Sequence, residues 1–233
     1  MHKFDRDMEV LTQAIVRYAV DRIRLDPPPL DAPKPESELR AMAGQTITAQ
    51  GLGGLEALRV FSDVLAPACI SVDHPRLLAF VPAAPTDSSI LFDLVVGASS
   101  IFGGSWLEGA GAVYAENQAL RWIADLAGLP EEAGGVFVSG GTAGNLSALV
   151  AARHEWRRLN PEMAQMRGLV ISSKGAHASM QQATDVMDAD MITIPGHRLT
   201  GEAVAATIAA LPSEQRQRLF AIAATAGTTN LGI

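Results

Sequence analysis

The sequence predicts an α/β protein with a mainly parallel sheet, preceded by a helical N-terminal arm. Two observations support this fold class. From about residue 130, short β-rich runs alternate with longer stretches of helical periodicity, as in strands joined by crossover helices. The first 70 residues carry helical patterns but no β-rich run. We therefore expect the arm in residues 1–70 and the α/β domain in residues 71–233.

Three helices are expected in the arm, at Met8–Leu25, Glu36–Ala43 and Gly51–Leu65. The prolines of Asp26–Pro29 end the first helix and begin an extended linker that runs to Pro35. Helices joined by such a segment commonly wrap a neighbouring chain instead of forming a core of their own. The arm is therefore predicted to wrap a partner.

The domain begins with two more predicted helices, Thr86–Gly97 and Ala110–Ala127, and Gly128 is suited to end the second. A strand-and-helix alternation follows. The expected strands are 136–138, 169–171, 191–194 and 219–223, and the expected helices end near Leu159, Val186 and Leu211.

Composition excludes several classes of function. The net charge is −7, and the one basic stretch, Arg153–Arg158, is typical of an exposed helix side, so no nucleic-acid partner is expected. One cysteine, Cys69, allows no internal disulfide and suits a reducing compartment. The charged N-terminus is unlike a secretory signal, and no apolar run reaches the roughly 20 residues that cross a bilayer. We predict a cytoplasmic protein without a membrane partner.

Three polar loops of small residues follow predicted strands, around Gly140, His177 and Thr228. Ligands of open parallel sheets bind beyond the carboxyl ends of the strands, so the three loops are expected to face one crevice. This crevice is where we expect the chemistry.

The Gly140-Gly141-Thr142 turn opens a helix. Its glycines allow close approach of a ligand, and free amides at a helix N-terminus attract anions, so the turn suits a phosphate. The alternative is an ordinary strand-to-helix turn that Thr142 caps. The spacing matches neither a Walker loop nor a dinucleotide-binding turn.

His177 has two interpretations from sequence: a residue that contacts a ligand, or one that caps the next helix or fills a gap. Thr228 and Thr229 fit either a ligand site or hydroxyls that bond the strand backbone. The other histidines have no metal-ligand spacing with a cysteine or carboxylate, so no metal is expected.

The ordered set of motifs resembles the group II pyridoxal-phosphate (PLP) dependent amino-acid decarboxylases, which include the aromatic-L-amino-acid and glutamate decarboxylases. The resemblance covers about residues 70–233 and extends more weakly into the arm. The segments that carry it are His74–Pro82, Gly104–Trp106, Gly134–Leu146, Ser173–Ser179 and Ala224–Thr229.

The resemblance implies the front part of a large domain of fold type I, like that of aspartate aminotransferase, with PLP as cofactor. It implies a homodimer with a shared active site. His177 would be the catalytic residue that stacks on the cofactor ring. The cofactor-binding residues would be Gly140, Gly141, Thr142, His177 and Thr229, and the substrate pocket would comprise Phe80, Val81, Pro82, Phe102 and Gly104, the last two from the partner subunit.

The chain also departs from the family pattern. The aspartate that bonds the cofactor ring and the lysine that holds the cofactor covalently have no counterpart in these 233 residues. Lys174, the one lysine near the motifs, is expected to point to solvent. The chain ends just after a predicted strand, so we expect a front portion of a larger protein. Gly104 stands where a large aromatic residue is common in aromatic decarboxylases.

The leading hypothesis is PLP-dependent decarboxylation of an L-amino acid, a small-molecule substrate, with an aromatic one favoured, to an amine and CO2. A non-catalytic alternative is a PLP- or phosphate-binding fragment, or a subunit that needs a separate C-terminal half. A related reaction such as oxidative deamination stays open. A nucleotide-binding α/β protein is disfavoured by the missing Walker and dinucleotide spacings.

Overall fold

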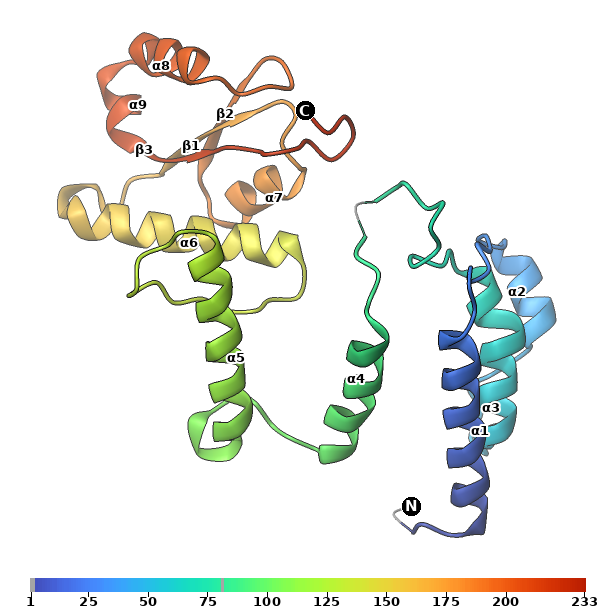
Figure 1. Cartoon of the computed structure of the whole chain (residues 1–233). Helices are drawn as coiled ribbons and strands as arrows, with labels where there is room; N and C mark the ends of the chain where they lie inside the picture. The colour runs from blue at the N-terminus through green and yellow to red at the C-terminus, as the bar shows by residue number, and fades with distance from the viewer. Residues whose placement is uncertain (1–2, 81) are drawn as a thin grey trace. The chain divides into compact units, whose positions relative to one another are not determined.

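The computed structural model describes residues 3–80 and 82–233, so the predicted pocket residue Val81 lies outside the described residues. The chain divides into two compact units, Met1–Phe102 and Gly103–Ile233 (Figure 1). Residues 71–102 thus belong to the same unit as the predicted arm. The predicted domains 1–70 and 71–233 stay a prediction about the complete protein.

The first unit is helical in its described residues, as predicted. It contains α1 (Arg6–Ile23), α2 (Glu36–Ala43), α3 (Gly54–Val60) and α4 (Asp87–Ser99). A π-helical turn, Phe61–Leu65, continues α3 to the predicted end of that helix. No helix among the described residues combines the length and the apolar character needed to span a bilayer.

Local chemistry explains where α1 begins and how it packs. The Asp5 side chain caps the helix by accepting a 3.1 Å hydrogen bond from the Met8 amide. A Cβ atom at Gly54 would lie 2.3 Å from a methyl carbon of Leu11, so a glycine lets α3 come close to α1. Farther along, the rings of Tyr18 and Phe61 meet edge to face, 5.9 Å apart.

An ion pair ties α1 to the loop that precedes the His74-Pro75 motif. Arg22 Nη2 donates a 2.9 Å hydrogen bond to Asp73 Oδ1, and both side chains are about 30% exposed. This bond holds the pKa of Asp73 below its usual range. A lowered folded-state pKa stabilises the fold above the unfolded-state pKa, and this stability is lost as the pH falls through the folded-state value.

We expect Asp73→Asn to lower the free energy of unfolding by roughly 0.5–1 kcal/mol at neutral pH, the size of a surface ion pair. The difference should shrink below about pH 4, where aspartate also protonates in the unfolded chain. Urea unfolding of both proteins at pH 7 and pH 3 measures it. Asp21→Asn is the control, because the side chains of the Arg17–Asp21 pair are 85% and 63% exposed. Equal losses in the two variants would contradict the prediction.

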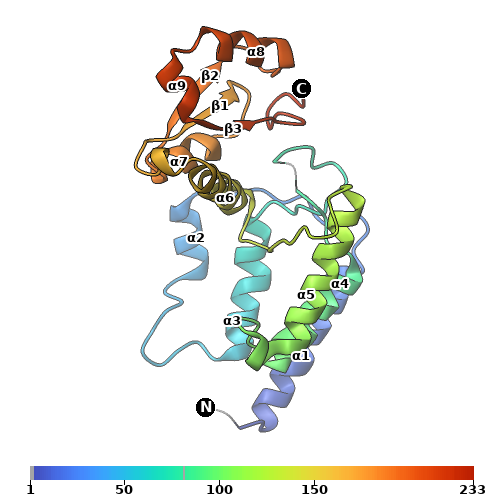
Figure 2. The same ribbon diagram turned by 90° about the vertical axis from the view of Figure 1, so that its left-hand side faces the viewer.

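The second unit contains a three-stranded parallel sheet with helices on both faces. Its strands are β1 (Leu169–Ser173), β2 (Asp190–Ile194) and β3 (Leu219–Ala223), in the order β2-β1-β3. One face is covered by α6 (Gly141–Leu159) and α7 (Ser179–Val186). The other is covered by α8 (Gly201–Ala210) and α9 (Ser213–Arg218), as both views show (Figures 1 and 2).

The core of this unit lies between the sheet and the α6–α7 layer. The central strand β1 is buried along its whole length, as expected of a parallel strand covered on both faces. Trp156 of α6 lies over Phe220 of β3, with ring centroids 6.0 Å apart. The buried cluster comprises Leu149, Val170, Met180, Ala183, Met187 and Ala189. The predicted α/β fold class is confirmed.

Three sequence predictions need correction. First, α5 (Trp106–Leu126) has one extra turn before the predicted start at Ala110, and a kink at Gly109 (φ −135°, ψ 37°) separates that turn from the predicted helix. The Ser105 hydroxyl accepts from the Glu108 amide and donates to the Glu108 carboxylate, which sets the earlier start. Second, the polar six-residue helix α9 was not predicted, because it has no apolar periodicity.

Third, residues 136–138 do not form the predicted strand in this structure. Val136, Phe137 and Val138 are exposed, and none of the three described strands pairs with them. A strand requires a neighbour to satisfy its backbone groups, and β propensity alone does not supply one.

Candidate functional site

A pocket lies at the carboxyl ends of the three strands. Its volume is about 410 Å³, and it is formed by the loops that follow β1, β2 and β3. The structure thus brings together the predicted residues His177 and Thr229, whereas Gly140, Gly141 and Thr142 of the third loop expected in this crevice are not among its described lining residues. The lining residues are Lys174, Gly175, Ala176, His177, Ala178, His197, Thr228, Thr229, Asn230 and Leu231.

Two lining residues change the sequence interpretation. Lys174 is exposed, as predicted, but it also lines this pocket. His197, in the loop after β2, has no metal-ligand spacing in the sequence, yet it lines this pocket. Its position just beyond a strand end, like that of His177, is the signal that could have identified it. No acidic residue is among the described residues that line the pocket, so its ionisable groups are basic apart from any bound ligand.

Gly175 allows the three loops to pack closely. A Cβ atom at this position would lie 2.7 Å from the backbone oxygen of His197 and 2.8 Å from Cγ2 of Thr228. Thr228 is buried, whereas Thr229 is exposed. Because one of the two clashes is with backbone, the neighbouring loop would have to move to admit any side chain here.

We expect Gly175→Ala to destabilise the protein by about 1–3 kcal/mol, the usual cost of overpacking. Thermal unfolding followed by circular dichroism measures the loss. Gly134→Ala is the matched control, because a Cβ atom at Gly134 meets nothing within 4 Å. Identical melting temperatures for the two variants would show that the loops do not pack this closely.

The Gly140-Gly141-Thr142 turn, which is predicted to bind a phosphate, lies at the start of α6. Gly140 has φ +86°, a conformation that favours glycine, and it precedes the first helical residue, Gly141. No side chain caps this helix end, so the alternative in which Thr142 caps the turn is not observed. The first amides of α6 therefore have no intrahelical partner.

The space in front of this turn is open. A Cβ atom at Gly141 would meet nothing within 4 Å, and Thr142 is exposed. Free amides and the positive end of a 19-residue helix dipole suit an anion such as a phosphate group. These residues fit the phosphate of the implied cofactor.

Hydrogen bonds join the turn's helix to the His177 loop. Asn145, in the first turns of α6, donates from Nδ2 to the Ser179 hydroxyl at 2.8 Å. The Ser179 hydroxyl lies 2.9 Å from Nδ1 of His177, and the Ser179 amide donates to the same nitrogen at 3.2 Å. No sequence pattern indicates this contact, because residues 145 and 179 belong to different helices.

The predicted substrate-pocket residues lie in both units. Phe80, Pro82 and Phe102 belong to the first unit, where Phe80 is 84% and Phe102 62% exposed. Gly104 lies in the second unit and is exposed. Because the units are described separately, the substrate role of these residues stays a prediction.

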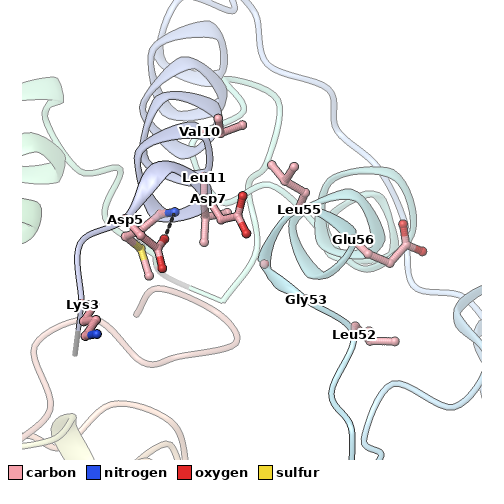
Figure 3. Close-up of a pocket in the computed structure, with 11 residues that line it drawn as sticks. Lys3, Asp5, Asp7, Val10, Leu11, Leu52, Gly53, Leu55 and Glu56 are labelled. Atoms are coloured by element: carbon pink, nitrogen blue, oxygen red, sulfur yellow. Dashed lines mark hydrogen bonds between the residues drawn. The ribbon is translucent and has the colours of Figure 1, made fainter. Parts of the chain in front are cut away.

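A larger hollow, of about 880 Å³, lies in the first unit between the start of α1 and α3 (Figure 3). Apolar side chains such as Val10 and Leu55 line it together with acidic residues and Lys3. Among the described residues that line it, none belongs to the predicted site and none has a histidine, cysteine or hydroxyl side chain. We assign it no chemical role.

The second unit is thus an α/β domain with a pocket beyond its strand ends, the place where open parallel sheets bind their ligands. The chain belongs to the pyridoxal-dependent decarboxylase family, whose conserved domain matches residues 50–233. Its fold is a partial fold type I domain, as predicted.

Relatives and solved structures agree with this membership. The chain is 30% identical over 215 residues to an aromatic-L-amino-acid decarboxylase of Bacillus atrophaeus, covering 85% of this chain and 43% of that protein. It is 26% identical to an L-2,4-diaminobutyrate decarboxylase of Acinetobacter baumannii, covering 84% of this chain and 42% of that protein.

In structure, it is similar to Oryza sativa TDC with PLP and tryptamine, with a TM-score of 0.83 and 20% identity over 98% of this chain and 51% of that one. Mouse CSAD gives a TM-score of 0.82 and 18% identity over 99% of this chain and 50% of that one. At these identities the structures show the fold alone. The chain spans less than half the length of the two curated relatives.

Proposed function

We propose that the protein containing this chain catalyses PLP-dependent decarboxylation of an L-amino acid to an amine and CO2, with an aromatic substrate favoured. The observation that carries the proposal is the hydrogen-bonded connection between an uncapped helix N-terminus and His177 at a basic pocket. The aromatic preference is supported by the similarity to the Bacillus atrophaeus aromatic-L-amino-acid decarboxylase.

The residues in the second unit would hold the cofactor by three contacts. The amides near Gly141 and the Thr142 hydroxyl would bind the phosphate. His177 would lie over the ring, and Thr229 would bond near the ring hydroxyl. PLP supplies an electron sink when bound, and the protein anchors, sandwiches and orients it.

His177 has a defined hydrogen-bonding arrangement for its role. An amide can only donate, so Nδ1 of His177 accepts from Ser179, and a neutral ring then carries its proton on Nε2. Nε2–H is a donor for a substrate carboxylate. The proposed role is to hold that carboxylate in the orientation from which CO2 leaves.

The proposal extends to assembly and location. We propose a cytoplasmic homodimer with a shared active site, in which the helices of the first unit pack on a second copy. Support comes from α4, which is apolar yet has no buried residue. Exposed apolar side chains on it are Leu91, Phe92, Leu94, Val95 and Val96. We also propose that the lysine that holds the cofactor lies outside these 233 residues.

The test is to purify the complete protein, titrate it with PLP, and measure CO2 and amine release from a panel of aromatic, acidic and basic L-amino acids. Decarboxylation with the highest kcat/KM for an aromatic substrate is expected. PLP binding without CO2 release from any amino acid would overturn the proposal in favour of a non-catalytic PLP-binding protein. Release of ammonia and an aldehyde together with CO2 would instead indicate oxidative deamination.

A further inference from the structure

Ser179 is placed to control the orientation of His177. It is the first residue of α7, and its side chain is fully buried. Its hydroxyl lies between two side chains: Asn145 Nδ2 at 2.8 Å and His177 Nδ1 at 2.9 Å. A buried hydroxyl with two such partners has little rotational freedom.

The direction of these hydrogen bonds follows from the donors. The Asn145 amide group donates to the serine oxygen. Nδ1 of His177 accepts from the Ser179 backbone amide, so it has a lone pair and the serine O–H can donate to it as well. The relay therefore runs from Asn145 through Ser179 to His177, and it favours the ring form with the proton on Nε2.

We propose that Ser179, itself oriented by Asn145, is a positioning residue whose hydroxyl holds the ring orientation of His177 and reinforces the tautomer that the Ser179 amide favours. This inference rests on the proposed function for its catalytic consequence, but its structural part does not. His177 is exposed at the pocket, so without this contact a single backbone amide is its one described hydrogen-bond partner. The same relay connects the phosphate-binding helix to the ring that would lie over the cofactor.

The first test is spectroscopic and needs neither substrate nor activity. Ring ¹⁵N signals of His177, assigned by comparison with His177→Ala, should show an unprotonated Nδ1 and a protonated Nε2 in the complete protein. In Ser179→Ala only the longer 3.2 Å amide contact would remain at Nδ1, so the signals should move toward a mixture of the two neutral forms. Ser172→Ala is the matched control, because it removes another fully buried serine hydroxyl that does not contact His177. Unchanged signals in Ser179→Ala would overturn the proposal.

The second test is kinetic. Ser179→Ala should lower kcat about three- to tenfold, the effect of one lost hydrogen bond, with a smaller change in KM. Ser179→Thr, which keeps a hydroxyl, should recover part of the loss. In a His177→Ala background, Ser179→Ala should have no further effect, because a residue that acts through His177 needs His177. The same fold loss in both backgrounds would show a merely structural role.

These tests distinguish failure of the proposed function from failure of the positioning role of Ser179. If no amino acid is decarboxylated, the proposed function fails, while the ¹⁵N signals still decide the positioning role. If Ser179→Ala does not fold, Asn145→Ala takes its place, because Asn145 is only partly buried and its loss frees the same hydroxyl. Asn145→Ala with unchanged ¹⁵N signals and kcat would also overturn the proposal.

Discussion

His177→Ala in the complete protein should lower the turnover number about a hundred- to ten-thousand-fold, the contribution typical of a positioned acid, base or orienting group. PLP affinity should change little. The reason is that the proposed roles are divided: the phosphate would be held by the amides of α6, whereas His177 would offer Nε2–H to the substrate. Steady-state kinetics and a PLP absorbance titration on the same preparations measure the two effects separately.

His154→Ala is the matched control for this change, because His154 is an exposed histidine on α6 that does not line the pocket. It should retain wild-type turnover. A His177→Ala variant with near-native turnover would remove His177 from the mechanism. A variant that loses PLP and turnover in proportion would instead make His177 a cofactor-retaining residue.

The positions of the elements were largely predictable, because the strands and the helices of the α/β unit other than α9 carry their own periodicity. The runs at 169–171, 191–194 and 219–223 all became strands, and the glycine at position 128 ends α5 through positive φ. The convergence of His177 and Thr229 was also predictable, since parallel strands present their carboxyl ends at one edge.

Contacts between distant segments were not predictable from the same patterns. Ser179 and Asn145 are 34 residues apart and meet only because α6 and α7 pack on one face of the sheet. The need for glycine at position 175 depends on how closely the β2 loop approaches. The incorrect prediction of a strand at 136–138 has a related cause. A strand forms where a partner strand is available, and local composition carries no information about the partner.

Gly141→Leu should weaken PLP binding by about a hundredfold or more, since the loss of two charge-assisted hydrogen bonds costs roughly 3 kcal/mol. Gly141 is the first residue of α6, where free amides face open space. A Cβ atom at this position meets nothing within 4 Å, and the backbone does not require positive φ. The side chain should therefore leave the fold intact and occupy only the space where the phosphate would bind.

Gly201→Leu is the matched control for Gly141→Leu. Gly201 is likewise the first residue of a helix, α8, and a Cβ atom there also meets nothing within 4 Å. It differs in one respect: the Thr200 side chain caps α8 by accepting a 3.2 Å hydrogen bond from the Ala203 amide, whereas α6 has no such cap. Equilibrium titration with PLP, together with melting curves of both proteins, should show equal stability and a loss of affinity only in Gly141→Leu. Unchanged affinity in Gly141→Leu would mean that the phosphate binds elsewhere, and the uncapped end of α6 would then need another explanation.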